Sequence, residues 1–147
     1  MATENRVIID NIISTFDNGN KLLILGCGGS LAESSHFAAE LISIGKPAIA
    51  LNDPAVITAL SNDFSFDECF TKQIKALAKT GDMVIAFSTS GISRSVLKAL
   101  EYADKLGLDI IDWPRDKGTT TGEIQENQLK DIHEVYLAIK KHYENNI

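Results

Sequence analysis

The sequence has few of the residues that would place it in a specialised structural class. Its 147 residues include two cysteines, three prolines and one tryptophan. Cys27 and Cys69 are too few for a disulfide framework or a thiolate metal site, which predicts a reduced, cytoplasmic protein. No apolar run approaches the roughly 20 residues that span a bilayer, and the first residues lack the pattern of a signal peptide. We therefore expect neither a membrane segment nor a secretory leader.

Positive charge is also scarce. Lysine and arginine total 14 against 20 acidic residues, which gives a net charge of −6 and no basic patch for a nucleic acid. The content of 44% hydrophobic and 23% charged residues is that of an ordinary globular domain. We expect a single domain over 1–147, made of an N-terminal helix (1–20), an α/β core (21–122) and a C-terminal helix (123–147).

Short apolar runs alternate with longer amphipathic segments. The runs have no alternating polar face, as expected for parallel strands that are covered on both sides. This repetition predicts an α/β fold, a three-layer α/β/α sandwich with a central parallel sheet of four to five strands. The expected strands are 21–25, 48–51, 83–87 and 108–111, the expected helices are 4–16, 31–44, 55–60, 67–79, 93–106 and 123–143, and 112–122 is expected to be a loop.

A glycine-rich turn follows the first expected strand. The sequence Gly26-Cys27-Gly28-Gly29-Ser30 opens a helix, so a phosphate or sugar can approach the backbone at a helix N-terminus. A tight turn without a ligand is the alternative. A dinucleotide-binding fingerprint fits less well, because Leu31 stands where its third glycine belongs, although Asp53 could imitate the acid that binds ribose.

A hydroxyl-rich segment, Ser88-Thr89-Ser90-Gly91-Ile92-Ser93, follows the third expected strand. Helix capping requires one hydroxyl, whereas this segment offers four beside a helix N-terminus. The absence of a Gly-Lys-Ser/Thr triplet argues against a nucleoside-triphosphate loop. The pattern therefore favours a sugar phosphate.

Two histidines and a glutamate are candidate metal ligands or acid–base groups. His36 and Glu40 are four residues apart on one helical face, a spacing that suits a divalent metal or acid–base catalysis but also an ordinary surface pair. His133 lies on the last expected helix, eight residues after Gln125. A lone helical histidine is usually packed or exposed, and His142 near the C-terminus is expected to be so.

Taken in order, these motifs resemble the sugar isomerase (SIS) domains, and within them the phosphoheptose isomerase branch. The resemblance runs from about Lys21 to Tyr143. It implies an aldose–ketose isomerase that converts sedoheptulose 7-phosphate to D-glycero-D-manno-heptose 7-phosphate. The motifs that carry it are the glycine turn, His36-Phe37-Ala38-Ala39-Glu40-Leu41, Ser61-Asn62-Asp63-Phe64, the hydroxyl segment and Ile124-Gln125-Glu126.

The resemblance assigns one group of residues to the substrate. The hydroxyl segment and Ser30 would hold the phosphate, while the remaining residues of the group would contact the sugar. The implied substrate-binding residues are Gly28, Gly29, Ser30, Asn62, Asp63, Ser88, Thr89, Ser90, Ser93 and Gln125.

The resemblance assigns a second group to catalysis. Glu40 and His133 match an acid–base pair that moves a proton between carbons 1 and 2 through an enediol. A metal site, usually zinc, is implied at His36, Glu40, Gln125 and His133, without a nucleotide cofactor. On a straight helix Gln125 and His133 are about 12 Å apart, so one ion contacts both only through a bent helix, unusual reach or two subunits.

The sequence departs from the family at several points. Cys27 replaces the usual asparagine, and the chain after Glu40 lacks a loop that carries an arginine. The chain is too short for the family's last strand, and Gly122 stands where relatives offer Asp or Thr.

The alternative function is a non-catalytic SIS module that binds a sugar phosphate or a protein. A bacterial replication-initiation regulator of that kind lacks equivalents of Glu40 and His133, and their retention favours an enzyme. Family members are commonly homotetramers with active sites between subunits, and we expect a homo-oligomer here.

Overall fold

The computed structural model describes residues 1–145 and contains the expected alternation of strands and helices. Within these residues no helix is both long enough and apolar enough to cross a membrane. The elements are α1 (Thr3–Asp17), β1 (Leu22–Leu25), α2 (Gly29–Ser43), β2 (Ala48–Ala50), α3 (Pro54–Asp63), the 3₁₀ turn η1 (Phe66–Glu68), α4 (Cys69–Leu77), β3 (Met83–Ala86), α5 (Arg94–Lys105), β4 (Asp109–Asp112) and α6 (Thr121–Asn145).

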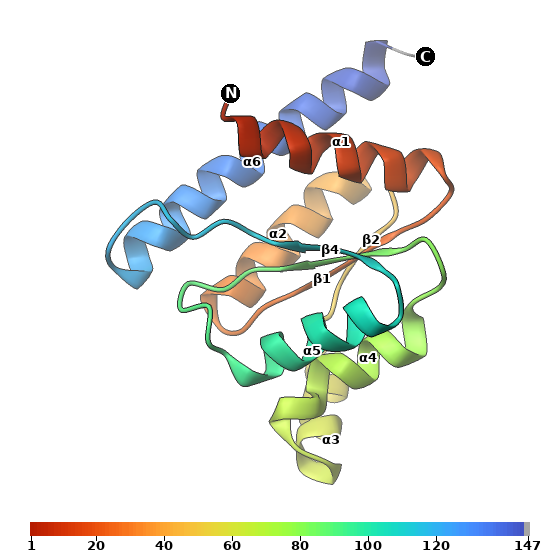
Figure 1. Ribbon diagram of the computed structural model, residues 1–147, viewed down its shortest axis with the longest axis vertical. Coiled ribbons are helices and arrows are strands. Elements are labelled where there is room, and N and C mark those ends of the chain that lie inside the picture. The colour runs from red at the N-terminus through yellow and green to blue at the C-terminus, as the bar shows by residue number, and fades with distance from the viewer. Residues whose placement is uncertain (146–147) are drawn as a thin grey trace.

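The four strands form one parallel sheet in the order β2-β1-β3-β4. Helices α1, α2 and α6 cover one face, whereas α4 and α5 cover the other, as Figure 1 shows. The predicted three-layer α/β/α fold is therefore confirmed. No fifth strand forms between β4 and α6 in the described chain, as the shortened sequence predicts.

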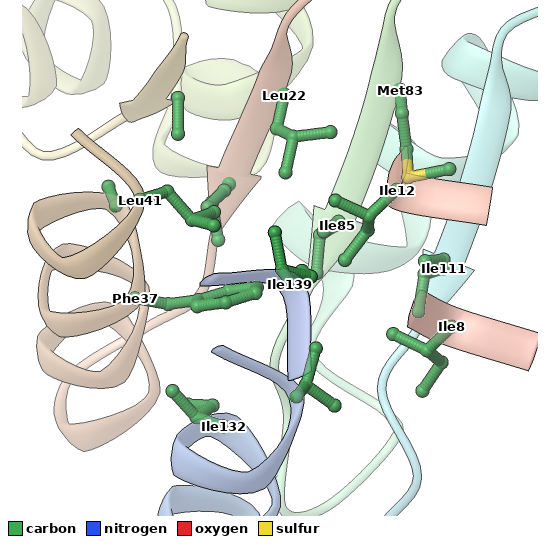
Figure 2. Close-up of a cluster of buried hydrophobic side chains, with 14 of the residues drawn as sticks. Ile8, Ile12, Leu22, Phe37, Leu41, Met83, Ile85, Ile111, Ile132 and Ile139 are labelled. Carbon is green, nitrogen blue, oxygen red and sulfur yellow. The ribbon is translucent and has the colours of Figure 1, made fainter. Parts of the chain in front are cut away.

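Successive side chains of each strand enter opposite faces of the sheet, because strand residues alternate with a period of two. Leu22 and Ile24 pack with α1, α2 and α6, while Leu23 and Leu25 pack with α4 and α5. All four are fully buried, which explains why the sequence shows a continuous apolar run rather than an alternating one. Figure 2 shows the first of these two cores, into which α6 inserts Ile132 and Ile139.

Trp113 belongs to this core, although the composition of 112–122 predicts a loop. Its backbone N–H donates to Ala86 O at 2.9 Å, continuing the pairing of β4 with β3 for one residue. The indole is fully buried and lies against the rings of Phe87 and Phe37, with centroids 4.8 and 5.6 Å away. Trp113 therefore covers the end of β3.

The strand order places a crevice between β1 and β3. The chain leaves β1 toward β2 on one side and returns to β3 on the other side. At such a reversal the connections that follow the two strands separate, and ligands of open parallel sheets bind there. The glycine turn follows β1 and the hydroxyl segment follows β3, so both candidate motifs lie at this point.

Glu33 is an unusual component of α2. Its side chain is buried, and neither carboxylate oxygen has a hydrogen-bond partner in the described part of the chain. Burial disfavours the charged form and raises the pKa of Glu33 to about 7. The native protein therefore holds a proton on Glu33 at pH values where the unfolded chain has released it.

We expect Glu33 to make the protein less stable as the pH rises from about 4.5 to about 7. The raised pKa costs on the order of 3 kcal/mol of unfolding free energy once that window has been crossed. Glu33→Gln cannot ionise, so the difference in unfolding free energy between this variant and the parent should grow in the variant's favour across the window. Urea unfolding at several pH values measures it, and a constant difference would contradict the prediction.

Candidate active site

A cavity of about 200 Å³ lies at the crevice between β1 and β3. Helices α2 and α5 both begin beside it, and neither has an acidic residue in its first turn. Helix N-termini attract anions because their first N–H groups are unpaired. The residues that line the cavity are Cys27, Ser30, Phe87, Ser88, Thr89, Ser90, Ser93 and Val96. The five residues predicted to bind the phosphate therefore come together around one small, hydroxyl-rich cavity.

The hydroxyl segment 88–93, which we call the phosphate loop after its predicted role, is held partly by its own side chains. The backbone N–H of Gly91 donates to Ser88 Oγ at 3.0 Å, and that of Ile92 donates to Ser90 Oγ at 3.2 Å. Both hydroxyls accept these bonds and keep their own protons for an anion. Gly91 has a φ of +72°, a conformation that favours glycine.

Cys27 lies where the family resemblance expects an asparagine. Its Sγ is 3.5 Å from Ser93 Oγ and 3.4 Å from Ser95 Oγ, so the thiol contacts the phosphate loop rather than pointing to solvent. The other cysteine, Cys69, is fully buried among α4 and α5, and burial raises the pKa of its thiol. Both thiols are free.

Arg115 is a neighbour of the phosphate loop that the sequence analysis does not identify. A Cβ atom placed on Gly91 would lie 2.5 Å from Arg115 Nε, so the guanidinium group rests directly on the glycine. Two hydrogen bonds of 2.8 and 3.0 Å join the guanidinium to Asp112 and raise the pKa of Arg115. Its place in the sequence could have identified it, since Arg115 follows β4 at the edge of the sheet where ligands bind.

A second candidate cluster joins α2 to α6. Nε2 of His36 is 3.0 Å from Nε2 of His133, and Glu40 Oε1 contacts both, at 3.4 Å from His133 Nε2. The three ligand atoms lie within 4.8 Å of one another. The two histidines are about half exposed, whereas the Glu40 side chain is only 16% exposed. The structure therefore brings together the predicted acid–base pair and three of the four predicted metal ligands.

This arrangement fits a divalent cation. Two imidazole nitrogens and one carboxylate oxygen converge on the same point, and these are donor types that zinc prefers. Glu40 Oε2 is buried and has no hydrogen-bond partner among residues 1–145, so the carboxylate is not satisfied by the protein alone. A bound cation would give this carboxylate a further partner of opposite charge.

Gln125 lies elsewhere along α6. A Cβ atom on Gly29 would collide with Gln125 Nε2, which places the amide against the glycine turn. The eight residues between Gln125 and His133 correspond to about 12 Å of helix. Within one chain the structure thus brings Gln125 to the N-terminus of α2, while its role as a metal ligand or substrate contact stays a prediction.

Asn62 and Asp63 lie apart from both clusters. They end α3, where Asn62 Nδ2 donates to Asp63 Oδ1 at 3.1 Å, and neither lines the cavity. In Figure 1, α3 and α6 lie at opposite ends of the molecule. Within one chain, the structure therefore does not bring Asn62 and Asp63 together with the other predicted substrate-binding residues, and their contact with a sugar stays a prediction.

A larger cavity of about 420 Å³ lies beside the segment after β4. Asp112, Asp116 and Glu4 line it, together with Arg115. Arg115 is already paired with Asp112, so the remaining carboxylates make the cavity unsuitable for a phosphate. The smaller hydroxyl-lined cavity is the better candidate.

Comparison with known proteins agrees with this geometry. The SIS domain profile matches residues 5–112. A phosphoheptose isomerase from Thermodesulfovibrio yellowstonii is 48% identical over 118 residues, which cover 76% of this chain and 59% of that protein. One from Geotalea uraniireducens is 40% identical over 136 residues, covering 88% of this chain and 72% of its own length. The chain thus spans less than two thirds of some curated relatives and more of others.

The fold of this chain is also similar to that of a solved phosphoheptose isomerase. The phosphoheptose isomerase from Neisseria gonorrhoeae superposes with a TM-score of 0.88 at 31% identity, covering 95% of this chain and 86% of that one. The similarity includes the parallel sheet and the helices on both of its faces. The chain therefore belongs to the SIS domain family, in the branch that contains the phosphoheptose isomerases.

Proposed function

We propose that the protein is an aldose–ketose isomerase that converts sedoheptulose 7-phosphate to D-glycero-D-manno-heptose 7-phosphate. The observation that carries the proposal is the contact between the Glu40 carboxylate and the His133 imidazole, near a hydroxyl-lined cavity at the N-termini of two helices. Relatives that are named phosphoheptose isomerases support it.

The spacing of the two clusters suits a long sugar phosphate. Ser30 lines the cavity, and His36 is six residues further along α2, about 9 Å along the helix axis. With carbon–carbon bonds of about 1.5 Å, an extended seven-carbon chain places carbon 1 on the order of 10 Å from a phosphate on carbon 7. A three-carbon sugar phosphate would reach only about half as far. The spacing therefore suits a sugar phosphate of six or seven carbons better than a three-carbon one, and the choice of a heptose rests on the named relatives.

Glu40 and His133 would divide the proton transfers. The Glu40 carboxylate would remove a proton from one carbon and return it to the neighbouring carbon, forming an enediol between the two steps. The His133 imidazole would exchange a proton with the carbonyl and hydroxyl oxygens. In the proposed binding mode, Ser88, Thr89 and Ser90 hold the phosphate.

We predict that the purified protein isomerises sedoheptulose 7-phosphate, and that Glu40→Gln and His133→Ala each lower kcat by about 10²–10⁴. Each variant removes one proton carrier without removing the phosphate loop. His142→Ala, on the same helix as His133, is the matched control and should keep its activity. Product formation is followed by chromatography of the sugar phosphates. Wild-type protein that binds the sugar phosphate but shows no turnover, with or without zinc, would instead support a non-catalytic binding module.

A divalent metal site at His36, Glu40 and His133 forms part of the proposal, with zinc as the ion and Gln125 as the predicted fourth ligand. The convergence of three ligand atoms and the unpartnered Glu40 Oε2 support it. A bound cation would supply electrostatic stabilisation of negative charge on the substrate oxygens.

We expect one zinc ion per chain, measured by elemental analysis after dialysis, and a loss of zinc affinity of at least tenfold in His36→Ala because one ligand is removed. His142→Ala should retain the ion. Gln125→Ala tests the fourth ligand by the same measurement. Equal zinc content in the His36→Ala variant and the parent would contradict the proposed site.

A homo-oligomer, most simply a tetramer with sites between subunits, completes the proposal. None of the ten residues of α3 is buried, although this helix contains Val56 and Ile57, and the nearby Phe64 is 60% exposed. Such an apolar element is usually covered by a partner. An oligomer would also give Asn62 and Asp63 a route to the sugar. The cytoplasm as the location stays a prediction.

We predict that sedimentation equilibrium gives the mass of four chains, and that Val56→Asp shifts the protein toward smaller species. A charge on a buried interface position is strongly destabilising to association. Circular dichroism of the variant verifies that the subunit remains folded. A wild-type protein that sediments only as a monomer would refute the proposed assembly.

A further inference from the structure

Gln128 connects α6 to the phosphate loop. Its side chain is 1% exposed, and Nε2 donates to Ser88 O at 3.2 Å and to Pro114 O at 3.3 Å. Ser88 is the first residue of the phosphate loop, and Pro114 immediately precedes Arg115, whose guanidinium group rests on Gly91. One amide group therefore holds two segments that shape the loop.

Only half of the Gln128 amide has hydrogen-bond partners. Its Oε1 is buried and has no hydrogen-bond partner in the part of the chain described. A buried acceptor without a partner destabilises the folded state, and this offsets part of the stability that the two hydrogen bonds from Nε2 contribute. The donor half of the amide is the part that the structure uses.

The position of Gln128 on α6 gives these hydrogen bonds a second consequence. His133 follows five residues later on the same helix and contacts His36 and Glu40. The helix that carries one member of the proposed acid–base pair is thus bonded directly to the start of the phosphate loop. This connection sets the separation between the two ends of the site.

We propose that Gln128 is a positioning residue that fixes the phosphate loop relative to His133 through its hydrogen bonds to Ser88 O and Pro114 O. This inference rests on the proposed function, in which the loop binds the phosphate of the substrate. Gln128 itself touches no reacting atom. Without its donor, the first hydroxyl of the loop is no longer held at the depth at which the loop closes around a phosphate.

The test compares two buried glutamines. Gln128→Met removes the amide and keeps the length of the side chain. Gln73→Met is the matched control, because Gln73 is also buried and its Nε2 also donates to a backbone carbonyl, Cys69 O, within α4 and away from the loop. For the full-length protein and both variants, we would measure the Kd of inorganic phosphate by calorimetry, KM and kcat for sedoheptulose 7-phosphate, zinc content and Tm.

Gln128→Met is expected to raise both the Kd of phosphate and KM by roughly tenfold, the effect of misplacing one hydrogen bond to a charged group. Its kcat and zinc content should change little, because Glu40, His36 and His133 remain in place. Its Tm should fall by only a few degrees, because removal of the unpartnered oxygen offsets part of the loss of the two hydrogen bonds. Gln73→Met should leave the Kd of phosphate and KM unchanged.

Two results would overturn the proposal. One is an unchanged Kd of phosphate and an unchanged KM in Gln128→Met. The other is a rise in both quantities together with a large fall in Tm and a loss of bound zinc, which would indicate general disruption of the fold. The parent protein separates this failure from failure of the proposed function. If it binds phosphate without turnover, only the isomerase assignment fails and the Kd comparison still decides the role of Gln128. If it binds no phosphate, both proposals fail.

Discussion

The packing of α6 against α2 is the contact on which the candidate site depends. Ile132, Val135 and Ile139 from α6 share one core with Phe37 and Leu41 from α2. Side chains meet in the same order along both helices: Gln125 lies against Gly29, His133 against His36 and Tyr136 against Ser43. The two helices therefore run in the same direction. This apolar contact brings His36 and His133, which are 97 positions apart, to 3.0 Å.

Much of the fold could be predicted because local patterns and tertiary structure agree here. The strand runs are continuous and apolar, and the helical segments between them are long enough to cover both faces. Trp113 shows where this agreement ends. Its neighbours include Pro114 and Gly118, which indicate a loop, but its place in the core depends on Phe37 and Phe87 from other parts of the chain. Only tertiary packing could reveal that contact.

The candidate site likewise has contacts that the sequence could predict and contacts that it could not. Ser30 and the phosphate loop come together because parallel strands end at one edge of the sheet, and the strand order places those two segments side by side. The pairing of His36 with Glu40 follows from helical spacing alone. The arrival of His133 beside them, and of Arg115 on Gly91, depends on how α6 and the segment after β4 pack. No periodicity in one sequence encodes these distances.

Unpaired polar atoms are unevenly distributed in this molecule. Of the seven buried side-chain atoms without a partner in the described residues, five belong to Glu33, Glu40, Trp113 and Gln128, which lie on α2, on α6 or directly after β4. The helices on the opposite face contribute only Ser61 and Thr71. Unpaired buried groups are costly, and they tend to persist where a ligand or a reaction uses them. Their concentration around the contact between α2 and α6 gives a reason, independent of any motif, to locate the chemistry there rather than beneath α4 and α5.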